Sequence, residues 1–208
     1  MKKFLFSLLF FSSAFCADPI YDYINEIPVD LHGWFGINNQ NHLSSFFRRK
    51  DIKSVIELGS WTGLSTVFFA RKVGPDGVVF AVDTWLGSEA EEVHQRDPRL
   101  NHLYQLFLSN VKQKSLQDVI VPIRMRTSEA AKALSITADL IYVDADHRTE
   151  GVRNDIIDWY PHLNEGGIMC GDDWDWPSVR KGVIQAAHEL GKQVKGSIAF
   201  WWFEEDSR

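Results

Sequence analysis

Short apolar runs alternate with longer segments of helical periodicity from about residue 53 to the end of the chain. The runs that predict strands cover residues 54–58, 77–83, 118–124, 138–144 and 166–173. The segments that predict helices cover residues 63–73, 98–114, 128–134, 149–163 and 177–190. This alternation is typical of an α/β fold in which helices cover both faces of a parallel sheet. Residues 192–197 and 198–205 have strand character with no helix between them, so we expect an antiparallel pair at one edge.

The N-terminal pattern differs from the rest of the chain. Two Lys precede an apolar and Ser-rich stretch from Phe4 to Phe15, after which small residues and a Pro follow. This order is typical of a secretory signal peptide and is too short for a membrane-spanning helix. We therefore expect a signal peptide at residues 1–17, export to the periplasm or the medium, and no membrane span in the mature chain. A chain whose leader is not used would stay in the cytoplasm.

Composition narrows the classes of protein that remain. The 208 residues suit one domain with a full core, which we place at residues 51–208 behind an N-terminal cap segment at residues 18–50. The formal net charge of -6 argues against nucleic acid as the main partner. Cys16 and Cys170 are the two Cys of the sequence, so a disulfide framework is not expected. This composition is compatible with a monomer and with a homo-oligomer.

Polar residues gather where the expected strands end. Glu57 and Gly59 close the first strand, and Asp83 closes the second. Two acidic clusters, DADH at residues 144–147 and DD at residues 172–173, follow later strands. Because ligands bind beyond the carboxyl ends of parallel strands, these four ends predict one binding cleft.

The stretch ELGSWTGLS after the first strand suits a nucleoside cofactor. Gly59 permits a sharp turn, Gly63 lets a helix begin close to a ligand, and Asp83 can accept hydrogen bonds from ribose hydroxyls. The Gly spacing and the bulky Trp61 differ from a dinucleotide fingerprint, and the carboxylate of Glu57 is ill suited to a neighbouring pyrophosphate. Since Glu57 could instead interact with an ammonium group, S-adenosylmethionine fits better than NAD. A purely structural tight turn is the simpler alternative.

Three carboxylates are expected to meet at the ends of two neighbouring strands. Asp144, Asp172 and Asp173 would repel one another without a cation between them, and oxygen ligands in a cleft suit Mg²⁺ or Ca²⁺. We therefore expect a metal site, most simply for Mg²⁺, at these three residues. Asp146 and His147 are the candidates for a general base, and His147 has the more suitable ordinary pKa of about 6.5. As alternatives, the Asp pair could cap a turn and His147 could bind the start of the next helix.

The motifs VIELGSWTGLSTVFFA, VDTWLGS and LIYVDADHRTEGVRNDIIDWYPHLNEGGIMCGDDW together resemble the class I S-adenosylmethionine-dependent methyltransferases. The resemblance covers roughly residues 50–203 and is nearest to the branch of macrocin-type sugar O-methyltransferases, with similarity to the metal-dependent catechol-type enzymes. It implies a Rossmann-like, seven-stranded, mostly parallel sheet with an antiparallel last strand. It also ranks Asp146 first as the base and places metal ligands at the three Asp named above.

By position, the resemblance implies a set of cofactor-binding residues. They are Glu57, Gly59, Ser60, Gly63, Asp83, Trp85, Ser128 and Asp144. Trp85 would pack on the adenine, although a Trp of the hydrophobic core is the alternative. Ser128 would contact the adenine edge, although its position also suits a helix N-cap.

The function that follows is S-adenosylmethionine-dependent O-methylation of a small hydroxylated acceptor, such as a sugar or a catechol-like diol, assisted by a divalent metal. A metal-independent methyltransferase and a secreted, non-catalytic protein on the same fold are the alternatives. Residues 87–102 lack core periodicity and are expected to form a lid over the substrate. Asp155 and Asp158 are expected on a solvated helix face.

Overall fold

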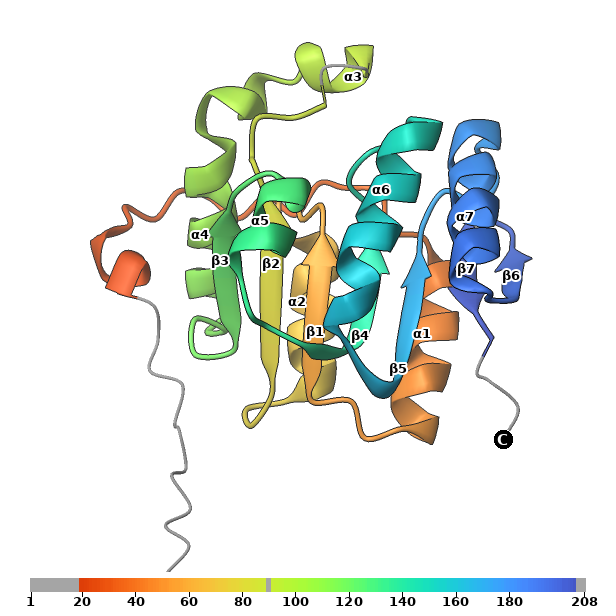
Figure 1. Cartoon of the computed structure of the whole chain (residues 1–208). Coiled ribbons are helices and arrows are strands. Elements are labelled where there is room, and N and C mark those ends of the chain that lie inside the picture. The colour runs from red at the N-terminus through yellow and green to blue at the C-terminus, as the bar shows by residue number, and fades with distance from the viewer. Residues whose placement is uncertain (1–18, 89–90, 205–208) are drawn as a thin grey trace, which may run out of the picture.

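A computed structural model describes residues 19–88 and 91–204, which form a seven-stranded sheet in the order β3-β2-β1-β4-β5-β7-β6 (Figure 1). The strands are β1 (Ser54–Leu58), β2 (Val78–Asp83), β3 (Ile120–Arg124), β4 (Ala138–Val143), β5 (Leu163–Gly171), β6 (Val194–Ser197) and β7 (Phe200–Phe203). Strands β1 to β5 pair in parallel, whereas β7 lies antiparallel between β5 and β6. The expected fold, including the antiparallel end of the chain, is confirmed.

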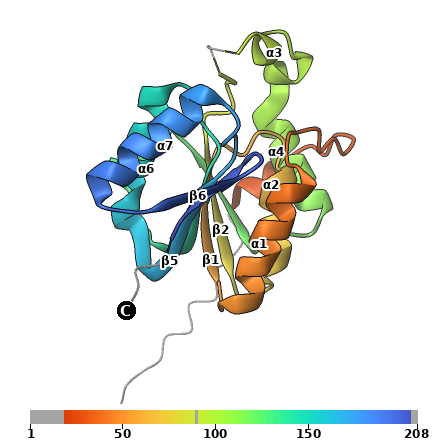
Figure 2. The same ribbon diagram turned by 90° about the vertical axis from the view of Figure 1, so that its right-hand side faces the viewer.

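Helices cover both faces of this sheet, as the views in Figures 1 and 2 show. One face packs against α1 (Ile37–Arg49), α2 (Leu64–Val73) and α4 (Leu103–Gln113). The other face packs against α5 (Thr127–Ala133), α6 (Thr149–Trp159) and α7 (Pro177–Leu190). Successive side chains of a strand point to opposite faces, so Tyr142 of β4 enters the first core and Val143 enters the second. The short helices are α3 (Glu92–Gln95), η1 (Pro19–Tyr23), η2 (Pro98–His102) and η3 (Tyr160–His162).

Local chemistry sets several of the helix ends. Pro177 occupies the first turn of α7, where its missing N–H costs nothing, and Gly191 ends that helix at φ 65°. Helix α5 begins at Thr127 with Arg126 at the N-cap position, and no side chain caps it. The expected N-cap role of Ser128 is therefore wrong, because this residue lies inside the first turn.

The N-terminal segment belongs partly to the core. The expected signal peptide at residues 1–17 lies outside the described residues. Within the expected cap segment, Leu43 of α1 is fully buried against the sheet. The extended residues before α1 cross the carboxyl edge of the sheet, where the hydroxyl of Thr62 donates to the carbonyl oxygen of His32 at 2.8 Å. Among residues 19–88 and 91–204, no helix has the length and apolar character needed to cross a membrane.

Candidate active site

A cavity of about 640 Å³ opens at the carboxyl ends of the parallel strands. Its wall contains residues that follow β1, β2, β3, β4 and β5, together with part of the N-terminal segment. The predicted site residues that line it are Gly59, Ser60, Asp83, Ser128, Asp144, Asp146, His147 and Asp173. The four strand ends thus surround one cleft, as their positions in the sequence predict.

Two glycines shape the loop after β1. Gly59 has φ +86°, and a Cβ atom at this position would lie 1.9 Å from the carbonyl oxygen of Asp144. Gly63 has φ +94°, and a Cβ atom there would lie 3.2 Å from the ring of Phe107. Both positions need a residue that tolerates positive φ, and Gly59 also needs the absence of a side chain. The loop can therefore pass directly beside the end of β4.

The carboxylate of Asp83 holds this loop in place. Its Oδ2 atom accepts hydrogen bonds from the backbone N–H groups of Ser60 at 2.8 Å and Trp61 at 2.9 Å. Its Oδ1 atom accepts from the N–H of Trp85 at 2.7 Å. A carboxylate oxygen has more than one acceptor site, so Asp83 keeps capacity for a ligand hydroxyl in the cavity that it lines.

Glu57 lies beneath the loop and outside the cavity wall. Its Oε2 atom accepts hydrogen bonds from the hydroxyls of Ser60, at 2.7 Å, and Thr66. Its Oε1 atom is buried and has no hydrogen-bond partner within the described part of the chain. Burial raises the pKa of Glu57 to about 7, although the hydroxyl donors oppose the shift.

Trp85 lies in the hydrophobic core. Its side chain is 1% exposed, and its ring centroid lies 4.6 Å from that of Tyr104 and 4.7 Å from that of Phe107. Its Nε1–H donates to the carbonyl oxygen of Trp61 at 2.9 Å, which ties it to the loop after β1. This position agrees with a core Trp, the alternative that the sequence left open, and not with a Trp of the cavity wall.

His147 lies among three carboxylates. Its Nδ1 atom is 2.6 Å from Oε1 of Glu91, and its Nε2 atom is 2.8 Å from Oδ2 of Asp173 and 3.8 Å from Oδ1 of Asp144. Burial alone would lower the pKa of His147, but its interactions with the three carboxylates, which accept from the protonated ring, outweigh burial and raise this pKa to about 12. The imidazolium is thus a positive charge within the acidic cluster.

The residues with metal-ligand geometry are Asp144, His147 and Asp173, whose donor atoms lie within 4.8 Å of one another. Asp172, the third expected ligand, does not join them. Its Oδ2 atom accepts from the hydroxyl of Tyr142 at 3.1 Å, and its Oδ1 atom accepts from the N–H of Asp173 at 2.8 Å. Asp172 is 7% exposed, and burial raises its pKa.

Asp146 pairs with Arg148. The Asp146 carboxylate accepts from the backbone N–H of Arg148 at 2.7 Å and from its Nε at 3.0 Å. Although burial opposes it, this pairing holds the pKa of Asp146 below its usual range. A Cβ atom at Gly151 would lie 2.1 Å from the Asp146 carboxyl, so the start of α6 must approach closely here. Asp146 lines the cavity but is a weaker base than an unpaired carboxylate.

A family model described as a methyltransferase domain matches residues 56–174 of this sequence. This span runs from β1 to the loop after β5 and contains the glycine loop, Asp83 and both acidic clusters. The chain belongs to this methyltransferase family. The expected membership in the class I S-adenosylmethionine-dependent methyltransferases is thereby confirmed.

Individual relatives of the methyltransferase are distant. An uncharacterized protein of Acanthamoeba polyphaga mimivirus is 21% identical over 164 residues, which cover 78% of this chain and 70% of the relative. A candidate caffeoyl-CoA O-methyltransferase from Staphylococcus aureus superimposes with a TM-score of 0.64 at 14% identity, over 83% of this chain and 86% of the other. The O-methyltransferase TomG from Streptomyces achromogenes, solved with S-adenosylmethionine, gives a TM-score of 0.63 at 14% identity, over 82% and 80% of the two chains. At such identities these structures support the fold.

The sequence did not indicate two further residues of the methyltransferase cavity. Glu91 lies in the segment expected to form a lid and contacts His147. The two residues are 56 positions apart, so the sequence gives no sign of this contact. Asp155 is 5% exposed, so its expected place on a solvated helix face is wrong. A signal for its burial was present, because Val152, Asp155, Ile156 and Trp159 follow the spacing of one helix face.

Aromatic and apolar side chains surround the mouth of this cavity. Trp34 and Trp176 line it and are 53% and 42% exposed. The ring of His94, from the lid segment, stacks on Trp61 at 4.5 Å and lies 5.5 Å from Trp34. The described part of residues 87–102, where a lid is expected, thus contacts both the loop after β1 and the N-terminal segment.

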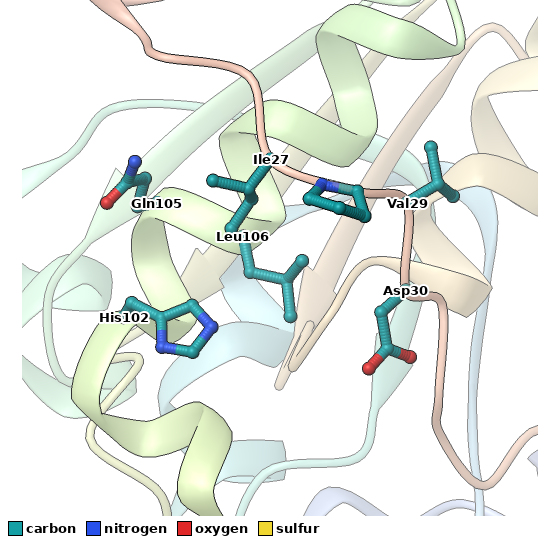
Figure 3. Close-up of a pocket in the computed structure, with 7 residues that line it drawn as sticks. Ile27, Val29, Asp30, His102, Gln105 and Leu106 are labelled. Carbon is teal, nitrogen blue, oxygen red and sulfur yellow. The ribbon is translucent and has the colours of Figure 1, made fainter.

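A second, smaller pocket of the methyltransferase lies between the N-terminal segment and α4 (Figure 3). Ile27 and Asp30 face His102 and Leu106 across it. The Asp30 carboxylate accepts a hydrogen bond from Nε of Arg99 at 2.7 Å, so it serves an ion pair of the scaffold. The chemistry of the chain is therefore concentrated in the larger cavity.

Proposed function

We propose that this methyltransferase transfers a methyl group from S-adenosylmethionine to a hydroxyl of a small acceptor, with a divalent cation assisting. One observation carries the proposal: a single cavity contains both the glycine loop with Asp83 and the group of Asp144, His147 and Asp173. A nucleoside site and a set of oxygen and nitrogen ligands are therefore close enough to act on the same substrate.

Several residues fit the cofactor. Asp83 would accept hydrogen bonds from the ribose hydroxyls, and Gly59 and Ser60 would lie along the methionine part. Ser128 lines the same cavity and is the candidate contact to the adenine edge. The unpartnered Oε1 atom of Glu57 lies under this loop and suits a water-mediated interaction with the ammonium group. S-adenosylmethionine would supply the methyl group on its sulfonium.

Asp144, Asp173 and, after it releases a proton, His147 fit a divalent cation such as Mg²⁺, although a nitrogen ligand is less typical of that ion than oxygen. Such a cation would bind neighbouring acceptor oxygens and lower the pKa of the reacting hydroxyl. The hydroxyl proton then needs a base of the chain. Asp146 is the candidate while His147 is a ligand, and its pairing with Arg148 must loosen for this task.

A metal-independent methyltransferase is the second candidate, and one observation favours it. The imidazolium of His147 already supplies a positive charge between Glu91, Asp144 and Asp173. In this arrangement the acidic cluster needs no metal for its charge balance. The imidazolium would then bind and orient the acceptor hydroxyl, and one of the neighbouring carboxylates would take the hydroxyl proton.

Calorimetric titration of the full chain with S-adenosylmethionine and S-adenosylhomocysteine, with and without Mg²⁺, tests the proposal. We expect both ligands to bind, and Asp83→Ala to weaken both on the order of ten-fold or more, since two ribose hydrogen bonds are lost. Asp118→Ala, at an exposed position before β3, is the matched control and should leave binding unchanged.

Activity toward a panel of vicinal diols, sugars and catechols then separates the alternatives. Loss of methyl transfer in EDTA, restored by Mg²⁺, supports the metal-assisted form, and activity unchanged by EDTA supports the metal-independent one. If neither cofactor form binds, the proposal is wrong. Binding without transfer to any acceptor would favour a non-catalytic protein on this fold.

A further inference from the structure

Glu91 presents its carboxylate to the ring of His147 from a segment that is distant in the sequence. Its Oε1 atom lies 2.6 Å from Nδ1 of His147, and the Glu91 side chain is 13% exposed. Although burial opposes it, this contact holds the pKa of Glu91 below its usual range, so the carboxylate is ionised. An ionised carboxylate only accepts hydrogen bonds, and therefore Nδ1 of His147 carries the proton of this contact.

The other nitrogen of His147 lies beside Asp144 and Asp173, which line the cavity. This Nε2 atom is buried and, within residues 19–88 and 91–204, has no aligned hydrogen-bond partner. Oδ2 of Asp173 lies 2.8 Å away and Oδ1 of Asp144 lies 3.8 Å away, so these contacts are ion pairs. A buried ring nitrogen without a hydrogen bond is costly, and a bound ligand would supply the missing partner.

Local contacts brace the short segment that carries Glu91. Glu91 precedes α3, and its side chain does not cap that helix. The N–H of Ser88 donates to Nδ1 of His94 at 3.2 Å, which closes the turn around Glu91. The His94 ring stacks on Trp61, so the turn is held against the loop after β1. The Glu91 carboxylate is therefore presented to His147 by a turn with its own anchors.

We propose that Glu91 positions His147 for the acceptor. By holding the Nδ1–H group, the Glu91 carboxylate keeps Nε2 directed toward the hydroxyl that reacts, or toward the cation that assists it. The inference rests on the proposed function, because it takes the acceptor hydroxyl to be bound beside His147. The hydrogen bond that one imidazole nitrogen makes determines which nitrogen meets a ligand and how the ring is turned. In this role Glu91 acts through His147 and is a positioning residue.

An ion pair that only fastens the segment to the end of β4 is the alternative role for Glu91. Trp176 also constrains the ring of His147, since the two ring centroids lie 4.9 Å apart. If Trp176 and the two Asp residues suffice to orient the ring, it stays in place when Glu91 is removed. If Glu91 orients it, the ring turns and its contact with Trp176 changes. The two roles therefore predict different geometries of the same pair of rings.

The test is nuclear magnetic resonance of the full chain with isotopically labelled His and Trp. We expect the wild type to show a hydrogen-bonded Nδ1–H signal, identified by its absence in His147→Gln, and Overhauser contacts between the rings of His147 and Trp176. Glu91→Ala should lose both. Glu91→Gln should keep both, with the Nδ1–H signal moved upfield, because the amide oxygen is a weaker, neutral acceptor. Glu92→Ala removes a carboxylate that pairs with Arg96 on the surface, so it is the matched control and should change neither.

Kinetics give a second readout, on whichever acceptor of the panel above the wild type methylates fastest. We expect Glu91→Ala to lower kcat by about ten-fold to a hundred-fold with little change in KM, which is the typical loss for the outer partner of a site histidine. Glu91→Gln should recover most of the loss. A tie of the segment instead predicts a raised KM, an unchanged kcat and no difference between the two variants.

Retention of the Trp176 contact in Glu91→Ala would overturn the inference, and so would the absence of the Nδ1–H signal from the wild type. Should Glu91→Ala not fold, the Nδ1–H signal in Glu91→Gln still decides, because a signal that does not move has another acceptor than Glu91. If the wild type binds no S-adenosylmethionine or transfers no methyl group, the proposed function fails. The spectra then still decide whether Glu91 positions the ring of His147.

Discussion

The Nε2 atom of His147 lies 2.8 Å from the Oδ2 atom of Asp173, and this contact joins the two acidic clusters of the sequence. His147 follows β4 and Asp173 follows β5, so the pair bridges the ends of neighbouring strands. Their side chains are 16% and 23% exposed, which leaves the pair partly shielded from water. Charge balance in the cleft thus depends on one imidazolium. Replacing His147 should therefore lower the stability of the fold measurably.

We expect His147→Gln to destabilise the fold by about 3 kcal/mol, because it leaves carboxylates without their cation in a poorly solvated site. The sign of the pH dependence follows from the raised pKa of about 12. The stabilisation is fully present below the unfolded pKa near 6.5 and is lost as the pH rises through the folded pKa. The deficit in Tm relative to wild type should therefore be larger at pH 6 than at pH 10.

Thermal melts of both proteins across this range provide the measurement. His188→Gln, at an exposed position near the end of α7, serves as the control and should follow the wild type at each pH. A deficit that grows as the pH rises would mean that His147 is not charged in the folded protein.

Divalent metal binding should depend on Asp173 and not on Asp172. Only the first of these two carboxylates lies with Asp144 and His147, whereas the second bonds Tyr142 on the other side of the strand end. We expect Asp173→Asn to reduce Mn²⁺ affinity at least about ten-fold through loss of a charged ligand. Asp172→Asn should leave that affinity within about two-fold, because its amide keeps an acceptor for the Tyr142 hydroxyl.

Titration with Mn²⁺, followed by electron paramagnetic resonance of the free ion, measures both constants. Equal losses of Mn²⁺ affinity in the two variants would mean that Asp172 is also a ligand, as the sequence predicts. If wild type and both variants bind no Mn²⁺, the metal-independent form of the function is favoured.

The sequence predicted the meeting of strand ends better than the direction of individual side chains. The parallel order brings Gly59, Asp83, Asp144 and Asp173 to one cleft, which follows from periodicity alone. Asp172 and Asp173 are adjacent, yet Asp172 bonds Tyr142 whereas Asp173, whose backbone has φ 57°, lines the cleft. No pattern of residues encodes that local conformation.

Long-range packing explains two other side chains whose positions differ from those that the sequence predicts. Trp85 enters the core, where its ring packs on Phe107 of α4. Asp155 is buried because Thr127 of the neighbouring α5 bonds it. Each of these positions depends on a contact with a segment distant in the sequence, although the helical spacing around Asp155 also indicates its burial.

Gly59→Ala should prevent the loop after β1 from forming. A Cβ atom would lie 1.9 Å from the carbonyl oxygen of Asp144, a backbone atom that cannot rotate away. Gly191→Ala is the matched control, because it also has positive φ, at +65°, in the left-handed helical region, but no atom lies within 4 Å of a Cβ there. We expect the control to lose only about 1 kcal/mol through backbone strain, and Gly59→Ala to lose several times more.

Urea unfolding of the two variants gives these free energies directly, and titration with S-adenosylhomocysteine shows whether the loop still binds the cofactor. Similar losses of stability in the two variants, with binding retained in Gly59→Ala, would contradict the close approach of the loop to β4.

Glu57→Gln should stabilise the protein relative to wild type at high pH. Burial raises the pKa of Glu57 from 4.5 to about 7, so the folded state takes up a proton that the unfolded state has released. Its contribution to stability is present below the unfolded pKa and is lost as the pH rises through the folded pKa. The amide cannot ionise, so the stability of Glu57→Gln minus that of wild type should rise between pH 5 and pH 8, by at most about 3 kcal/mol.

Urea unfolding of both proteins at several pH values isolates this group, because all other titrating residues are shared and cancel in the difference. Glu165→Gln, at an exposed position in β5, should show a flat difference over the same range. A flat difference for Glu57→Gln as well would mean that the carboxyl group finds a charged partner when folded. That result would contradict the unpartnered Oε1 atom beneath the cofactor loop, and with it the water-mediated ammonium contact proposed for Glu57.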